Sequence, residues 1–277
     1  MVITESNKNK NDGNMTATER LALIEVKIAR ANEHITNLRN VIQGFFDSKP
    51  YLISTKRDAS RKLVYYLTNV QPTPANIALI AGDAIQNLRT SLDHLAWRLF
   101  QTGTGGATNN RKVYFPIADD AAKYGAYLHS LSGFRSDAMT TFRTIEPYKG
   151  GKDEKLWVLN KLSVTDKHRL LVTVGSAFQS LNIGAYMTRQ LQDNELGIPV
   201  PKLDAYFKPT NNLFPLKIGD ELFIDAVDAK INEWLDFRFN IVLNEIGVSE
   251  GEPLLSTLTD ISNVVSKTVS LFTKCLI

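Results

Sequence analysis

The stretch PANIALIAGDAIQNLRTSLDHLAWRLF, residues 74–100, predicts one long helix, and this helix decides the fold. Pro74 suits its first turn, because the N–H that proline lacks is not needed there. Apolar residues recur at helical spacing and form one stripe that faces the core: Ile77, Ala81, Ala84, Leu88, Leu92, Leu95 and Leu99.

Working outward from this stretch, three more segments have long helical patterns, at 18–47, 153–169 and 253–274. Thr18 is expected to cap the first of them, and Glu252-Pro253 to open the last. Shorter helices are expected at 119–131 and 136–146, and QTGTGGATNN (101–110) is expected to be a loop.

The remaining segments are β-rich. YLIST (51–55) and KLVYYLTNV (62–70) predict a hairpin, and the strands expected between 170 and 244 include LLVTVGSAF, IGAYMT, LFPLKIGDELFID and LDFRFNIVLNE. The expected fold class is therefore α+β, a bundle of about four long helices with an antiparallel β-sheet inserted before the C-terminal helix.

The domain organisation follows from the same patterns. Residues 1–15 are polar, rich in Asn and Lys, and are expected to form a disordered tail. Residues 16–277 are expected to form a single α+β domain, because the chain returns to helical character after the sheet. Its helical parts are 16–50, 72–169 and 252–277, and its β-rich parts are 51–70 and 170–246.

Composition excludes several classes of protein. The net charge is only +3 and the basic residues are scattered, so the chain has no signature of duplex-DNA binding. No run approaches the ~18 apolar residues that span a bilayer, and the N-terminus lacks a secretory signal. We expect a cytoplasmic protein with no membrane part. The single cysteine, Cys275, excludes an internal disulfide and is expected to pack in the core.

Polar residues interrupt the long helix at 74–100. At ~100° per residue, Asp83, Asn87 and His94 form one polar line that borders the apolar stripe. Arg89 and Asp93 lie on a third face, one turn apart, and can form an ion pair. One interpretation is structural: Asp83 or Asn87 and a neighbouring helix satisfy both ring nitrogens of His94 in a buried polar network.

A second polar cluster, TDKHRLL (165–171), ends the helix expected at 153–169. Lys167, His168 and Arg169 suit a last helical turn, where cations meet the negative end of the helix dipole. Asp166 and His168, together with residues of the first cluster, could bind a divalent metal or supply acid and base. Neither cluster has ligand spacing such as His-Glu-x-x-His, so no metal ligand and no cofactor is assigned.

Three motifs, in the order in which they occur here, resemble those of a widespread bacterial family with no assigned activity. The motifs are GDAIQNLRTSLDHLAW (82–97), FPI (115–117) and LWVLNKLSVTDKHRLL (156–171). They match the family patterns G-D-x3-N-L-R-x2-L-D-H-L, F-P-I and D-K-H-R. The resemblance covers about residues 25–275.

Arg89 and His94 also have the Arg-x4-His spacing of the HEPN superfamily, helical bundles that include many ribonucleases. This resemblance implies RNA cleavage without a metal: His94 assists attack of the ribose 2′-OH, Arg89 stabilises the phosphate, and two copies form a homodimer. Thr90 stands where the superfamily usually has Asn, Asp or His. Residues five apart lie ~140° apart on a helix, so this pair converges only through a distorted helix or a second chain.

The sequence leaves three hypotheses open. The first is a HEPN-like RNA-binding or metal-independent RNA-cleaving protein that uses Arg89 and His94, with Asp166, Lys167, His168 and Arg169 nearby. The second is a non-enzymatic interaction or structural protein with a buried His/Asp network. The third is a metal-dependent hydrolase that uses His94, His168, Asp83 and Asp166.

Overall fold

The computed structural model describes residues 16–106, 113–169, 174–184, 187, 206–207, 213–232 and 235–276. The chain divides into two compact units. Unit 1 comprises Met1–Leu38, Leu79–Val172 and Leu255–Ile277, and unit 2 comprises Arg39–Ala78 and Thr173–Leu254. The α+β fold is confirmed. A single domain stays a prediction, and the predicted tail at 1–15 lies outside the described residues.

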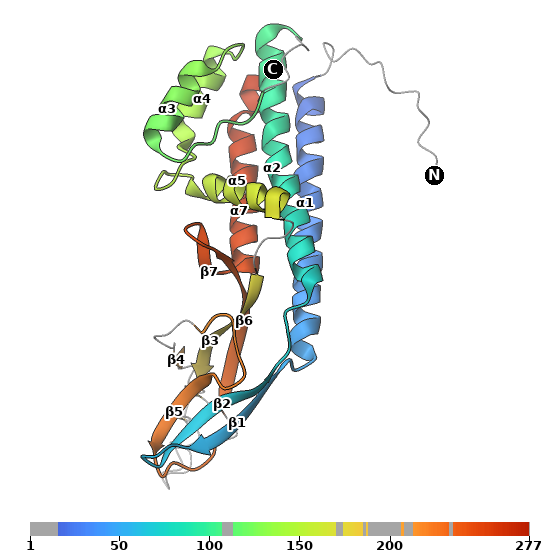
Figure 1. Ribbon diagram of the computed structural model, residues 1–277. Coiled ribbons are helices and arrows are strands. Elements are labelled where there is room, and N and C mark those ends of the chain that lie inside the picture. The colour runs from blue at the N-terminus through green and yellow to red at the C-terminus, as the bar shows by residue number, and fades with distance from the viewer. Residues whose placement is uncertain are drawn as a thin grey trace, which may run out of the picture. The chain divides into compact units, whose positions relative to one another are not determined.

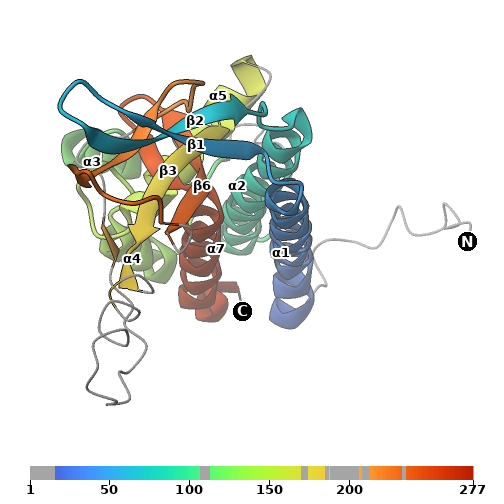
Figure 2. The same cartoon turned by 90° about the horizontal axis from the view of Figure 1, so that it is seen from below.

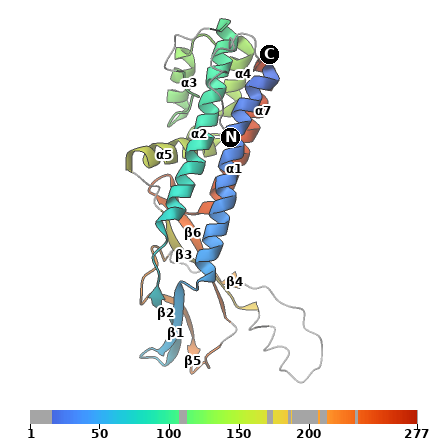
Figure 3. The ribbon, with the colours of Figure 1, turned by 90° about the vertical axis from the view of Figure 1, so that its right-hand side faces the viewer.

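The helices are α1 (Ala17–Asp47), α2 (Ala75–Thr104), α3 (Ala121–Ser130), α4 (Ser136–Ile145), α5 (Glu154–Arg169) and α7 (Leu254–Leu271), with a 3-10 turn at Thr273–Leu276. The four long helices predicted from the sequence are all present. Within unit 1, α1, α2 and α7 run alongside one another (Figures 1 and 3). None of the helices in the described part of the chain combines the length and apolar character needed to cross a membrane.

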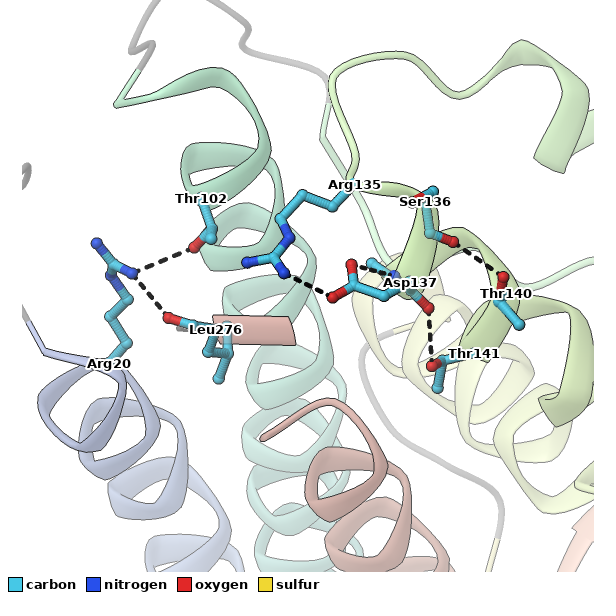
Figure 4. Close-up of polar contacts among 9 residues, drawn as sticks. Arg20, Thr102, Arg135, Ser136, Asp137, Thr140, Thr141 and Leu276 are labelled. Atoms are coloured by element: carbon cyan, nitrogen blue, oxygen red, sulfur yellow. Dashed lines mark hydrogen bonds and ion pairs between the residues drawn. The ribbon is translucent and has the colours of Figure 1, made fainter. Parts of the chain in front are cut away.

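The core of unit 1 lies between these helices. Every residue of the apolar stripe predicted on α2 is buried. Polar contacts also join the helices: Ser262 of α7 donates to the side-chain oxygen of Asn32 of α1, at 2.7 Å. At one end of the unit, Arg20 of α1 donates to Thr102 Oγ1 of α2 at 3.3 Å and to the Leu276 carbonyl at 2.8 Å (Figure 4).

Two predicted helix ends are wrong. Thr16, not Thr18, caps α1, because Thr16 Oγ1 accepts from the Glu19 N–H while the Glu19 carboxylate accepts from the Thr16 N–H. This reciprocal pair is a capping box, which fixes the first turn. At the other end, α2 continues to Thr104 and so includes the first four residues of the loop predicted at 101–110. It stops before Gly105, whose φ of 66° favours glycine.

The described residues of unit 2 form two antiparallel sheets. The strands are β1 (Tyr51–Arg57), β2 (Lys62–Val70), β3 (Val174–Asn182), β4 (Tyr206–Phe207), β5 (Glu221–Val227), β6 (Asp236–Glu245) and β7 (Ser249–Pro253). One sheet has the order β1-β2-β5 and the other β4-β3-β6-β7. Figure 2 shows the predicted β1–β2 hairpin and the neighbouring pair β3 and β6.

The secondary structure predicted for two segments of unit 2 is wrong. Ser249–Pro253 pairs with β6 as a strand, so the last helix begins at Leu254 and is not opened by Glu252-Pro253. A strand was also expected at IGAYMT (183–188), but Gly184 and Met187 have helical backbone, and the Met187 N–H donates to the Ile183 carbonyl.

The core of unit 2 is a cluster of five buried residues, namely Leu67, Phe178, Leu181, Leu216 and Leu222. Partly buried rings pack around it, among them Tyr51, Phe237 and Phe239. Tyr51 and Ile53 alternate along β1, and Phe237 and Phe239 alternate along β6, so one face of each strand points to the core.

Candidate functional site

Three faces of α2 meet different surroundings. The apolar stripe packs in the core, as predicted. The face that the sequence assigned to Arg89 and Asp93 is covered by α5, and we call these contacts the α2–α5 seam. It joins two sets of residues at helical spacing: Gly82, Gln86, Arg89 and Asp93 on α2, and Asn160, Ser163 and Asp166 on α5.

Arg89 is the centre of the seam and is only 9% exposed. Its Nη1 donates to Asp93 Oδ1 at 2.6 Å, which confirms the ion pair expected from the i,i+4 spacing. Its Nε donates to Asn160 Oδ1 of α5 at 3.0 Å. Asp93 Oδ1 also accepts from the backbone N–H of Phe115, at 3.0 Å. Arg89 therefore holds α5 against α2, and its partner Asp93 holds the 113–118 segment there.

Gln86 joins the next turn of the seam. Its side-chain amide donates to the Ser163 carbonyl at 3.0 Å and to Asp166 Oδ2 at 2.9 Å, and its own oxygen accepts from Ser163 Oγ at 3.0 Å. Asp166 lies directly over Gly82, where a Cβ atom would meet the carboxylate Oδ1 and lie 3.0 Å from its Cγ. Gly82 thus makes room for the Asp166 carboxylate.

These contacts join the three motifs that the sequence contains in separate segments. Gly82 and Arg89 belong to the first motif, Phe115 to FPI, and Asp166 to DKHR. Their contacts bring residues 82–93 of α2 against Asp166 and against the FPI segment. The chemistry of these residues in the seam is to orient helices, because each of their charges is met by a partner inside the chain.

His94 lies on the remaining face of α2, about 110° around the helix from the seam. His94 and Asp83 are exposed, and the half-buried Asn87 donates its side-chain amide to the Asp83 carbonyl of its own helix at 2.8 Å. The buried network expected around His94 is therefore wrong. The buried polar network is the seam, and it includes Arg, Asp, Gln, Asn and Ser side chains but not His94.

Two cations lie near His94. Partial shielding by its surroundings, together with Lys27 of α1 and Arg98 of α2, lowers the pKa of His94, while Asp93 opposes this shift. The imidazole is therefore mainly neutral at pH 7, so it can accept a proton. The sequence could have indicated Arg98, which follows His94 by one turn. Lys27 could not be found, since only the packing of α1 on α2 brings it near.

The other predicted site residues do not join His94 into a metal site. Lys167 and His168 are exposed in the last turn of α5, and the side chain of Arg169 lies outside the described residues. Across the part of the chain that the structure describes, no three His, Cys, Asp or Glu side chains gather as metal ligands would. The metal-dependent hydrolase hypothesis thus has no ligand set among these residues.

No protein-family model matches the sequence, no curated protein is similar to it, and no solved structure matches its fold.

Proposed function

We propose that this protein binds RNA and cleaves it without a metal ion, with His94 as the general base. The observation that supports the proposal is the exposed His94 imidazole of lowered pKa beside Lys27 and Arg98. A neutral imidazole at the surface is a suitable base at neutral pH, and two nearby cations suit a phosphodiester substrate. RNA is the proposed substrate, because RNA carries the 2′-OH that such a base activates and DNA does not. The cytoplasm is the proposed compartment.

The proposed reaction needs no co-reactant. Neutral His94 takes the proton of a ribose 2′-OH, and the resulting oxyanion attacks the adjacent phosphorus. The bond from phosphorus to the 5′-oxygen breaks, and the leaving oxygen takes a proton from water or from protonated His94. The products are a 2′,3′-cyclic phosphate and a free 5′-OH. Lys27 and Arg98 offset the negative charge that grows on the phosphate oxygens.

In this proposal Arg89 does not have the role that the HEPN resemblance implies. Its guanidinium is buried and bound to Asp93 and Asn160, on a different face from His94. We assign Arg89, Asp93 and Asp166 to the scaffold of the site. Lys167 and His168, exposed at the end of α5, are proposed as further contacts for the strand.

A homodimer is a separate part of the proposal. A second copy would bring another His94, with its two cations, to the same RNA. The molar mass in solution, measured by light scattering, tests this part independently of activity. A mass of one chain at all concentrations would remove the dimer and leave the cleavage proposal in place.

The test is cleavage of end-labelled single-stranded RNA in EDTA. We expect cyclic-phosphate products, and a cleavage rate that falls as the pH drops through the lowered pKa of His94. His94→Ala should abolish cleavage. His129→Ala, which removes an exposed histidine of α3, should leave it unchanged. Cleavage that survives His94→Ala, or no cleavage at all, contradicts the proposal.

The second candidate is a non-enzymatic interaction protein. The seam favours it, because Arg89, Asp93 and Asp166 all have partners inside the chain. The same assay separates the two candidates. Retained binding of RNA or another partner, with no cleavage in EDTA or in added metal, supports the second.

A further inference from the structure

Unit 2 contains an open cavity of about 750 Å³ that none of the sequence motifs indicated. It lies where α1 ends, β1 begins and β6 begins, at the margin of the unit 2 core. Its volume falls within the ~300–1,000 Å³ of typical ligand sites. Every residue that lines it belongs to unit 2.

Four half-buried aromatic rings line this cavity: Phe46, Tyr51, Phe237 and Phe239. Tyr51 lies at the centre of the group, with its ring centroid 4.3 Å from that of Phe239 and 6.3 Å from that of Phe46. The Tyr51 ring is tilted by 42° to that of Phe239 and by 54° to that of Phe46, and each of the four rings is only partly covered by the protein. A partly exposed aromatic face favours a flat ligand that can stack on it.

The local sequence explains how the rings meet. α1 ends at Asp47, and Lys49 has a φ of 53°, in the left-handed region. The Lys49 N–H donates to the Phe46 carbonyl at 2.9 Å, which closes the turn. The chain therefore turns between α1 and β1, and the last aromatic residue of the helix lies beside the first residue of the strand. Lys49 itself lines the cavity.

The rim of the cavity is polar and carries a net positive charge. Lys49 and Arg238 contribute two positive charges and Asp236 one negative charge, which leaves one positive charge. Arg238 Nε lies 3.2 Å from Asp236 Oδ2, and its guanidinium lies 4.7 Å from the centroid of the Tyr206 ring. A neutral ligand such as a sugar or an apolar side chain would leave these cations without a charged partner in the ligand, whereas an anionic ligand would pair with them.

The exposed amides of Gln43 and Gln179 also line the cavity. The Gln43 amide donates one N–H to Asp47 Oδ1 at 2.8 Å, which leaves its second N–H and its oxygen. A side-chain amide that offers both a donor and an acceptor suits the edge of a nucleobase. A stacking surface, amides and a net positive charge together match a base attached to a phosphate. Proteins that bind single-stranded nucleic acid combine aromatic stacking with basic side chains in this way.

We propose that the unit 2 cavity binds a nucleotide, with the base on the aromatic rings and the phosphate at Lys49 and Arg238. This inference rests on the proposed function only for the kind of strand, RNA. The same chemistry serves a nucleotide within a strand or a free mononucleotide, and binding to the two can be measured separately.

The test uses the full chain and a fluorescein-labelled 2′-O-methyl RNA oligonucleotide. This probe lacks the nucleophilic 2′-OH, so its binding does not depend on cleavage at His94. Fluorescence anisotropy should show binding that Phe46→Leu weakens by at least about fivefold, the factor that corresponds to the lower end of the effect of losing a stacked base. His129→Ala, which removes an exposed histidine of α3 outside both proposed sites, should leave this binding unchanged.

The charged rim is tested with the double variant Lys49→Gln and Arg238→Gln. Its binding should weaken and depend less on salt, with a log–log slope smaller by about 0.7 to 1.4. Lys56→Gln is the matched control, because Lys56 is an exposed lysine of β1 that pairs with Glu221. It should change the affinity by less than about twofold, the size of a surface-charge effect.

Competition with adenosine monophosphate separates the two sources. Displacement of the probe indicates a site for free nucleotides, and displacement only by unlabelled oligonucleotide indicates a site for a strand. Both results support a nucleotide site. The inference is overturned if neither ligand binds at about 100 µM, the weak limit of non-specific binding, or if Lys56→Gln weakens binding as much as the double variant. Circular dichroism of each variant verifies that it is folded.

Discussion

Replacing Arg89 by methionine separates a structural role for this residue from a catalytic one. Methionine keeps the apolar length of the side chain but removes the hydrogen bonds to Asp93 and Asn160. A hydrogen bond to a charged group contributes about 1.5–3 kcal/mol, and breaking a fully buried ion pair costs about 3–5 kcal/mol. The Asp93 side chain is 26% exposed and keeps the Phe115 N–H, so water and that donor relieve part of the loss. We expect Arg89→Met to lower the free energy of unfolding by about 2–4 kcal/mol.

Urea denaturation measures this change, and an unchanged m-value shows that the midpoint shift is a change of stability. Lys155→Met is the control, because its pair with Asp260 has the same kind of charges at 3.0 Å but both side chains are about half exposed. That variant should lose less than about 1 kcal/mol. If Arg89→Met loses no more than Lys155→Met yet abolishes RNA cleavage, the structural role assigned to Arg89 is refuted.

Three further outcomes are expected in unit 1. Gly82→Ala should lower the free energy of unfolding by about 1 kcal/mol, because displacing Asp166 from Gln86 costs more than the ~1 kcal/mol that alanine gains over glycine in a helix. Gly125→Ala is the control: its surroundings are open, so the same urea titration should show a gain in stability. The lowered pKa of His94 means that the unfolded chain binds the proton first, so the wild type should lose stability as the pH falls through 6.5 toward that pKa. His94→Gln should remove this loss, and a parallel pH dependence of the two proteins would contradict the lowered pKa. The Cys275 thiol is 4% exposed and its pKa is raised by burial, so Ellman's reagent should react slowly until urea unfolds the chain; prompt reaction in the native state would exclude this packing.

The three faces of α2 could be predicted from the sequence because they depend on one number, the rotation per residue. That rotation correctly separated the apolar stripe, the Arg89–Asp93 pair and the His94 line. Which neighbour covers each face could not be predicted. The burial of a polar face depends on where α5 crosses α2, and this contact joins residues about 70 to 80 positions apart in the sequence. His94 was therefore expected to be buried, when Arg89 is buried in its place.

In the β-rich part, prediction from the sequence was limited for a different reason. Alternation predicted β1, β2 and β6, whose side chains divide between a core face and a solvent face. Ser249–Pro253 has no apolar alternation and forms a strand because a short turn returns it to pair with β6. The unit 2 cavity could not be predicted for a similar reason: Phe46, Tyr51 and Phe239 come from three elements, and the left-handed turn at Lys49 brings the first two together.

The Gly82–Asp166 contact also limits how the chain can vary. It fixes the rotational phase of α2, since only a residue without a side chain fits beneath the carboxylate. One residue inserted between Gly82 and His94 would turn the rest of the helix by about 100°, move the His94 face toward the apolar core and break the Arg89 contacts. Substitutions on the His94 face leave the seam intact. The surface chemistry of this helix can therefore diverge by replacement of residues, but its length between these two positions has to remain constant.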